Sequence, residues 1–330
     1  GDYAIMNALQ RVMAEMNIPH KDFAVISGIG CSSRFPYYMS TYGFHTIHGR
    51  ATAVASGVKC ANPGLNVWVI TGDGDSMAIG GNHFIHLVRR NIDLNVIIFN
   101  NKIYGLTKGQ YSPTTDRGIK TKTSPYGTIE DSFNPGQLVI GAGGSFFARS
   151  IDGNLKLSQE IFHEAARHQG TSIVEVLQNC MIYNNGVHDE ITDPAFRAER
   201  QLMLKHGEPM RFGENNEKGI AFVRGKLKVV TPGKNGITDD DILIHDATDP
   251  DPMLHLALLK MQLPEFPVAF GVIRNVASPV YDQEMGKQIA EIQRTRKITC
   301  MDDLLRSGNT WEVKGNGFIP DNNQCRNKNH

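Results

Sequence analysis

The sequence predicts an α/β protein built on a doubly wound, mostly parallel sheet, with a C-terminal arm. Apolar runs of strand length alternate with helix-length segments over the first 195 residues, which is typical of parallel strands covered by helices on both faces. The runs at 67–70 and 95–99 are joined by one helix-length segment, 76–91, and such a crossover makes two strands parallel. Polar residues follow both runs, at the sheet edge where open α/β proteins bind their ligands.

The elements of this first part are expected in a regular order. Asp2 is placed to cap a helix whose apolar face holds Ile5, Leu9, Val12 and Met16 at helical spacing. The segment 111–135 is rich in Thr, Ser, Pro and Gly, and a loop of this length in a compact domain is usually functional. Strands are expected at 23–26, 67–70, 95–99, 146–149 and 172–177, and further helices at 49–61, 76–91, 137–142 and 157–165.

The alternation of helix and strand weakens after about residue 195. We therefore expect residues 1–195 to form a diphosphate-binding domain and residues 196–330 to form an extension that packs on this domain or on a partner. Within the extension, short strands are expected at 226–230 and 242–244, helices at 254–261 and 283–293, and an irregular polar tail at 315–330.

The charge balance and the scattered cysteines argue against several classes of protein. Lys and Arg together number 34, as do Asp and Glu, and no basic stripe stands out, so no nucleic-acid partner is expected. No apolar run reaches bilayer length and no secretion signal is visible, so we expect a soluble cytoplasmic protein without a membrane partner. The five cysteines argue for thiols or metal ligands rather than a disulfide framework: Cys31, Cys60, Cys180, Cys300 and Cys325.

Gly72-Asp73-Gly74 and Asn100-Asn101 are the most informative residues of the chain. Asp73 offers a carboxylate oxygen and Asn101 an amide oxygen, which suit a hard divalent cation such as Mg²⁺ shared with a diphosphate. Gly74 lets the backbone approach the phosphate groups, and helix N-terminal amides after Asp75 would help to bind them. Alone, either motif is better explained as a surface turn. Together, at this spacing, they are similar to the signature of thiamine-diphosphate enzymes.

Further motifs resemble the β subunits of 2-oxoacid:ferredoxin oxidoreductases. They read GIGCSSRFP at 28–36, HTIHGR at 45–50, NKIYGLTKGQ at 101–110 and LQNC at 177–180. The resemblance covers most of residues 1–200 and continues more loosely to about 285. Within this family, YSPTT at 111–115 and KTSPYG at 122–127 are most similar to the two-subunit 2-oxoglutarate enzymes.

The resemblance implies a set of residues that bind thiamine diphosphate and Mg²⁺. It assigns residues 1–195 to a thiamine-diphosphate-binding domain. The residues that it places at the cofactor are Ile29, Gly30, Cys31, Ser32, His48, Gly74, Asp75, Gly105 and Leu106, and those that it places at Mg²⁺ are Asp73, Asn101 and Ile103, the last through its backbone carbonyl.

The resemblance also implies a [4Fe–4S] cluster. Cys31 and Cys180 would be two of its ligands, although either thiol read alone is better explained as a buried structural cysteine. Because such a cluster takes four cysteines, the other two are expected upstream of Gly1, in a Cys-x-x-Cys-Gly-Asp stretch of which Gly1-Asp2 would be the end. We expect the natural chain to begin before Gly1.

The implied reaction is the oxidative decarboxylation of 2-oxoglutarate to succinyl-CoA and CO₂, with coenzyme A as acyl acceptor and electrons passing through the cluster to ferredoxin. Arg34, three residues after Cys31, is the candidate to bind the substrate carboxylate, since a guanidinium pairs bidentately with that group. A surface ion pair is the alternative for Arg34. His48 is the second catalytic candidate, as a polar contact to the cofactor or substrate.

One catalytic group is not found in the sequence. Thiamine enzymes need a carboxylate on the aminopyrimidine ring, which a second domain supplies, and only one strand–helix array is visible here. The resemblance therefore implies an α subunit that carries this domain, in an (αβ)₂ assembly. Three alternatives stay open: a pyruvate or branched 2-oxoacid enzyme, a thiamine-dependent decarboxylase or carboligase without redox chemistry, and a binding module without cofactor.

Overall fold

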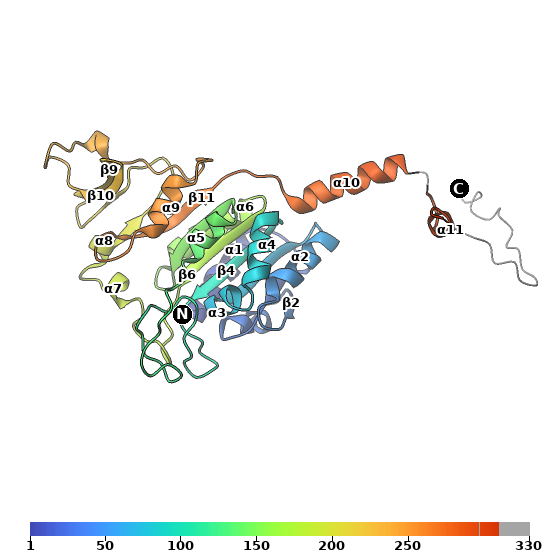
Figure 1. Cartoon of the computed structure of the whole chain (residues 1–330), viewed down its shortest axis with the longest axis horizontal. Helices are drawn as coiled ribbons and strands as arrows, with labels where there is room; N and C mark the ends of the chain where they lie inside the picture. The colour runs from blue at the N-terminus through green and yellow to red at the C-terminus, as the bar shows by residue number, and fades with distance from the viewer. Residues whose placement is uncertain (297, 310–330) are drawn as a thin grey trace, which may run out of the picture. The chain divides into compact units, whose positions relative to one another are not determined.

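The computed structural model describes residues 1–296 and 298–309 (Figure 1). The chain divides into two compact units, residues 1–282 and residues 283–330. The tail expected at 315–330 lies outside the described residues, as does Cys325.

Most of the described strands belong to one sheet of eight in the first unit (Figure 1). Its six strands from β2 to β5 are parallel to one another, whereas β11 runs antiparallel to β5 and pairs in parallel with the short edge strand β7. The predicted α/β class with a mostly parallel sheet is confirmed. In sheet order the strands are β2 (Tyr42–His45), β1 (Phe23–Ser27), β3 (Asn66–Gly72), β4 (Leu94–Asn100), β6 (Thr171–Leu177), β5 (Phe146–Ile151), β11 (Val268–Asn275) and β7 (Gln201–Met203).

Helices cover both faces of this sheet because successive strand residues point to opposite faces. In β4, Ile97 and Phe99 pack in one apolar layer with α1 (Asp2–Glu15) and α6 (Leu155–Arg167). Val96 and Ile98 of the same strand pack in the other layer. That layer contains residues of α2 (Ala51–Ala61), α4 (Gly81–Arg90), α5 (Pro135–Gly141) and α9 (Met253–Lys260).

The crossover between β3 and β4 differs from the prediction of one helix over 76–91. The chain forms α3 (Asp73–Met77) and then α4, with a break at Ala78, whose φ and ψ are −85° and −105°. A side chain at Gly80 would collide with the carbonyl oxygen of Asp75 and crowd the backbone of Gly49. The break therefore brings the loop before α2 against the end of α3.

Two smaller predictions are wrong. Asp2 is the first residue of α1 rather than its cap, and Gly1 holds the cap position without a side-chain hydrogen bond. No strand forms at 242–244: Ile244 makes only an isolated bridge with Pro209, and residues 239–241 form a 3₁₀ turn.

The structure divides the chain later than the sequence suggests. Strands β7 and β11 add to the main sheet, so residues well beyond 195 belong to the first unit. Between these two strands the chain forms an antiparallel sheet of β8 (Arg211–Phe212), β9 (Lys218–Val223) and β10 (Lys226–Val230). The remaining described helices are α7 (Asp189–Thr192), α8 (Arg197–Arg200), α10 (Tyr281–Thr295) and α11 (Met301–Leu305).

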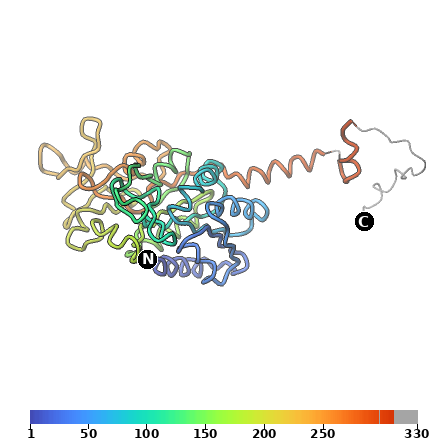
Figure 2. Tube along the Cα trace, turned by 60° about the horizontal axis from the view of Figure 1, so that its bottom comes forward, coloured from blue at the N-terminus to red at the C-terminus, as the bar shows by residue number. Residues whose placement is uncertain are grey.

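The predicted long loop is present and runs from the end of β4 to the start of α5 (Figure 1). Two segments distant in sequence also meet at this edge of the sheet. The N-terminus, marked in Figure 2, lies at the start of α1. The ammonium group of Gly1 lies 3.3 Å from the Asp152 carboxylate, and Asn179 adjoins Gly1. None of the described helices has both the length and the apolar character that crossing a bilayer requires.

Candidate functional site

A pocket lies at the carboxyl ends of β1, β3 and β4. The 3₁₀ helix Ser32–Tyr38 follows β1, and α3 follows β3, so both strands lead into turns whose backbones face the pocket. Of the predicted cofactor and metal residues, those that line it are Ile29, Gly30, Cys31, Ser32, Asp73, Gly74, Asp75, Asn101, Ile103, Gly105 and Leu106. Most of the predicted residues therefore meet in one pocket, whereas Arg34 and His48 are not among its lining residues.

Two glycines shape this wall. Gly30 has a φ of +97°, which a residue with a side chain rarely adopts. At Gly74 a Cβ atom would overlap the ring of Tyr104, whose hydroxyl donates a hydrogen bond of 2.8 Å to the Gly74 carbonyl oxygen. The backbone after Asp73 is thus held against a rigid aromatic ring, and burial raises the pKa of Tyr104 to about 12, so its hydroxyl keeps its proton.

Asp73 is only 2 % exposed. Its Oδ2 atom accepts hydrogen bonds of 2.5 Å from both the Ser112 and the Thr114 hydroxyl. Burial raises the pKa of Asp73 to about 6, although these hydrogen bonds oppose the rise. Among the described residues no cationic side chain pairs with Asp73. A buried carboxylate without a counter-charge fits a divalent cation, which would supply the charge that is missing.

Asn101 is oriented by its neighbours. Its Nδ2 atom donates to Gln178 Oε1 at 3.0 Å, and its Oδ1 atom accepts from the Ile103 backbone amide at 3.2 Å. Lys102 has a φ of +55°, which turns the backbone sharply between the two residues. One carboxylate, one amide oxygen and backbone carbonyls form a set of hard oxygen donors that suits Mg²⁺. Clusters of three or more His, Cys, Asp or Glu able to hold a metal are absent from the described part of the chain.

Asp75 has a different role from the other lining residues. Its Oδ1 atom lies 2.7 Å from both His48 Nδ1 and the Gly49 backbone amide, and its Oδ2 atom accepts from the Thr71 hydroxyl at 2.8 Å. Because both oxygens are engaged, Asp75 fixes the ring of His48 rather than presenting a free carboxylate to a phosphate. With Nδ1 donating to Asp75, Nε2 is the nitrogen that His48 keeps for another partner.

Arg34 is exposed, and its guanidinium lies 5.7 Å from the ring centroid of Tyr38. It is close enough to Cys31 for its charge to act on that thiol, but burial and the charges of Asp2 and Cys180 prevail and raise the pKa of Cys31. Because the charge of Cys180 acts on the pKa of Cys31, the two thiols lie close enough to interact electrostatically. Cys31 and Cys180 are both free thiols.

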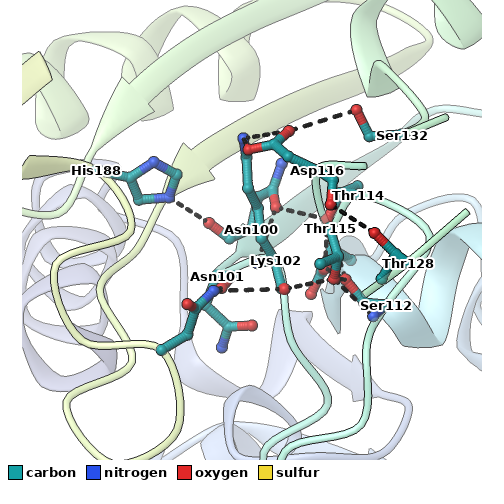
Figure 3. Close-up of polar contacts among 12 residues, drawn as sticks. Asn100, Asn101, Lys102, Ser112, Thr114, Thr115, Asp116, Thr128, Ser132 and His188 are labelled. Atoms are coloured by element: carbon teal, nitrogen blue, oxygen red, sulfur yellow. Dashed lines mark hydrogen bonds and ion pairs between the residues drawn. The ribbon is translucent and has the colours of Figure 1, made fainter. Parts of the chain in front are cut away.

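The turn that contains Cys180 is hydrogen-bonded to the loop that contains Asn101. Asn184, whose backbone amide bonds the Cys180 carbonyl at 3.0 Å, donates from Nδ2 to the Asn101 carbonyl at 2.9 Å. His188 Nε2 contacts the Asn100 carbonyl at 3.0 Å (Figure 3). The predicted cysteine ligand and the predicted metal ligand therefore belong to two segments that are joined directly.

The sequence did not indicate several polar residues behind the pocket, Glu175 and Arg149 among them. Glu175 Oε1 accepts a hydrogen bond of 2.7 Å from Asn100 Nδ2, and Glu175 Oε2 accepts one of 2.7 Å from Arg149 Nε. Ser112 and Thr114 were visible only as a run of hydroxyl residues around Pro113 in the long loop. That run gave no signal for a contact with Asp73, because 39 and 41 residues separate the partners.

Comparison with known proteins agrees with this geometry. Residues 28–176 match the family model described as thiamine pyrophosphate enzyme, C-terminal TPP binding domain. The fold and the site thus define a thiamine-diphosphate-binding domain.

Its relatives narrow this class. The chain is 41% identical over 316 residues to the 2-oxoglutarate oxidoreductase subunit KorB of Mycobacterium tuberculosis, covering 95% of this chain and 84% of the relative. It is 40% identical over 239 residues to the 2-oxoacid:ferredoxin oxidoreductase 2 subunit beta of Aeropyrum pernix, covering 67% and 77%. The chain belongs to the β subunits of the 2-oxoacid:ferredoxin oxidoreductases.

A solved structure is similar as well. The 2-oxoglutarate:ferredoxin oxidoreductase from Magnetococcus marinus, with 2-oxoglutarate, coenzyme A and succinyl-CoA bound, aligns with a TM-score of 0.73 and 30% identity, covering 94% of this chain and 90% of that one.

Proposed function

We propose that this chain is the β subunit of a 2-oxoglutarate:ferredoxin oxidoreductase, which converts 2-oxoglutarate and coenzyme A reversibly to succinyl-CoA and CO₂. The pocket that joins the Cys31 turn, the Asp73 turn and the Asn101 loop carries this proposal. The names of relatives from Mycobacterium tuberculosis, Archaeoglobus fulgidus and Methanocaldococcus jannaschii, each specifying 2-oxoglutarate, support the substrate.

In this proposal Asp73, the Asn101 side chain and the Ile103 carbonyl would hold Mg²⁺, and the backbone at Gly74 and Gly105 would lie along the diphosphate. Thiamine diphosphate, when bound, supplies a nucleophilic carbon and an electron sink for decarboxylation. The chain itself binds and orients: Tyr104 fixes the Gly74 backbone, and Asp75 fixes His48.

Cys31 and Cys180 would provide two thiolates of a [4Fe–4S] cluster that passes electrons to ferredoxin. Three observations support this assignment. Both thiols are free, and the charge of Cys180 acts on Cys31, so the two side chains lie near each other. Gly1 adjoins Asn179, the residue before Cys180. Arg34, exposed three residues after Cys31, would bind the substrate carboxylate once a partner covers it. A thiol set of this kind favours the reducing cytoplasm.

We further propose an α subunit that completes the active site, in an (αβ)₂ assembly. Leu106 lines the pocket and is 66% exposed, and the edge strand β2 exposes Tyr42 and Phe44. Large exposed apolar side chains beside a site are typical of a protein interface. The β-subunit names of the relatives point the same way.

The test is to produce this chain, at its natural length, together with its α subunit without oxygen. We expect ferredoxin reduction that requires both 2-oxoglutarate and coenzyme A, and its loss in Asp73→Ala together with loss of thiamine-diphosphate binding. Binding of thiamine diphosphate without ferredoxin reduction, in a complex free of iron and acid-labile sulfide, would favour a non-redox enzyme instead.

A second candidate function differs from the first in the 2-oxoacid that the enzyme uses. Relatives from Aeropyrum pernix and Saccharolobus solfataricus, 47% and 44% identical over their matched regions, carry the broader name 2-oxoacid:ferredoxin oxidoreductase. Competition between 2-oxoglutarate, pyruvate and a branched 2-oxoacid in the same assay decides between them. A higher kcat/KM for pyruvate would contradict the 2-oxoglutarate assignment.

A further inference from the structure

The long loop between β4 and α5 brings two hydroxyl groups onto one oxygen of the buried Asp73 carboxylate. Ser112 Oγ and Thr114 Oγ1 each lie 2.5 Å from Asp73 Oδ2, and all three residues are buried. The side-chain donors among the described residues thus converge on Oδ2, and none of them is directed at Oδ1. The backbone amides of Asp73 and Gly74 also act on this carboxylate.

We propose that Ser112 and Thr114 are positioning residues for the metal–diphosphate site, which fix the Asp73 carboxylate so that its other oxygen meets the cation. The inference rests on the proposed function of the site and adds a role for the long loop. The loop would supply no metal ligand of its own, yet it would determine how strongly Asp73 binds the cation.

Thr114 is itself held in place by a buried chain of polar contacts. Its Oγ1 atom lies 3.0 Å from Asn100 Oδ1, because the Asn100 amide nitrogen is directed to Glu175 at 2.7 Å. The other oxygen of Glu175, Oε2, accepts a hydrogen bond of 2.7 Å from Arg149 Nε. A hydroxyl has one proton, so Thr114 donates to Asp73 or to Asn100 at any moment, while Ser112 supplies the second proton.

The loop is anchored independently of Asp73. Thr115 Oγ1 donates to the Lys102 carbonyl at 2.6 Å and accepts from the Ser112 backbone amide at 2.8 Å (Figure 3). The Lys102 ammonium group pairs with the Asp116 carboxylate at 2.7 Å. Since these bonds do not involve the Thr114 hydroxyl, its removal should leave the loop folded and change only the support of the carboxylate.

Partners that orient a metal ligand without touching the metal commonly account for tenfold to hundredfold in affinity. We therefore expect Thr114→Val, which keeps the shape and removes the hydroxyl, to raise the Mg²⁺ concentration for half-maximal thiamine-diphosphate binding by about tenfold or more. Thr114→Ser keeps the hydroxyl and should bind as the unmutated protein does. Ser112→Ala should resemble Thr114→Val.

The experiment titrates Mg²⁺ into the cofactor-free complex of this chain with its α subunit, at fixed thiamine diphosphate, and follows binding by calorimetry. Thr123→Val is the matched control, because Thr123 lies in the same loop and is exposed, and among the described residues its hydroxyl contacts Thr121 alone. The rise in the thermal midpoint that Mg²⁺ and cofactor produce provides a second readout.

The possible outcomes separate the two proposals. If Thr114→Val and Ser112→Ala both bind with the Mg²⁺ dependence of Thr123→Val, the positioning role is wrong while the proposed function stands. If Thr114→Ser is as weak as Thr114→Val, the hydroxyl is not the cause and the role is equally wrong. If the unmutated complex binds no cofactor at any Mg²⁺ concentration, the proposed function fails, and the inference with it.

Discussion

At the scale of single residues, Gly28 controls the position of Asp75. A Cβ atom at Gly28 would overlap the Asp75 carboxylate, which holds His48 and the Gly49 amide. A glycine is needed here for close approach rather than for an unusual φ, since the adjacent carboxylate occupies the space of a side chain.

We expect Gly28→Ala to displace Asp75 and with it the His48 ring, lowering kcat of the assembled enzyme at least tenfold and lowering its thermal midpoint. Gly57→Ala is the control, because Gly57 lies in α2 with nothing within 4 Å of the added Cβ. Replacing a helical glycine by alanine stabilises by roughly 0.5–1 kcal/mol. If Gly28→Ala and Gly57→Ala had the same kcat and the same thermal midpoint, the expectation would be wrong and Asp75 could move without loss of function.

His255 and Arg274 form a second residue-scale feature, in the part of the chain that the sequence left least explained. Arg274 Nη1 lies 3.0 Å from His255 Nδ1, and His255 Nε2 contacts the Asp246 carbonyl at 2.8 Å. Arg274 Nε also donates to the Gly144 carbonyl at 3.0 Å. Burial, aided by Arg274, lowers the pKa of His255, so the neutral ring is the form that fits.

This pair predicts loss of stability in acid. Because folding lowers the pKa of His255, the unfolded chain takes up the proton first as the pH falls below about 6.5, and the free energy of unfolding declines from there. One such histidine contributes at most about 1.4 kcal/mol per pH unit. Thermal midpoints between pH 8 and pH 5 should therefore fall less in His255→Gln than in the unmutated protein, and identical slopes would refute the assignment.

At the scale of elements, β5 and β6 are joined by a buried ion pair as well as by their backbone ladder. Arg149 of β5 and Glu175 of β6 are opposite each other in register, and their side chains are 7% and 2% exposed. Glu175 also receives the Asn100 amide from β4, so three neighbouring strands share one polar contact at their carboxyl ends.

We expect Arg149→Met to destabilise the protein by about 3–5 kcal/mol, since it leaves the Glu175 carboxylate buried and unpaired. The double variant Arg149→Met/Glu175→Leu should recover a large part of that loss, because no charge remains buried. Arg117→Met is the control: its pair with Asp131 is exposed, with side-chain accessibilities of 59% and 83%, and should not matter. Chemical denaturation measures all three; a single variant as stable as the control would contradict the expectation.

The elements that the sequence missed share a physical cause. β11 and β7 complete the main sheet through pairings with partners far away in the chain, at Phe146 to Arg149 and at Val268 to Phe270. The edge strand β7 has only three residues and carries little local signal, because neighbouring strands stabilise it more than its own propensity does. β11 has eight residues, and its place in the sheet depends on packing between segments distant in sequence. Helical periodicity, in contrast, correctly indicated α9 and α10 in the same region.

At the scale of the whole molecule, the site occupies one edge of a parallel sheet, and in the proposed function an α subunit completes it. Leu106 and the strand β2 expose apolar side chains on unit 1. We expect the purified β chain alone to reduce no ferredoxin with 2-oxoglutarate and coenzyme A, and addition of the α subunit to restore activity. Turnover by the β chain alone would exclude the two-subunit active site.

The sequence by itself determined the class of fold and most of the residues that line the pocket. Its local signals were sufficient there because apolar runs define parallel strands, and the carboxyl ends of parallel strands share one edge. The sequence alone thus predicts that Asp73, Asn101 and the Cys31 turn meet.

Only the tertiary structure decided what supports these groups. Ser112, Thr114 and Gln178 orient the predicted metal ligands, and Asp75 orients His48, through contacts between segments 27 to 77 residues apart. The direction of a hydroxyl or an amide depends on the packing of whole elements, which no spacing along the chain encodes. For the same reason the sheet extends to β11, and the boundary expected near 195 lies at residue 282 instead.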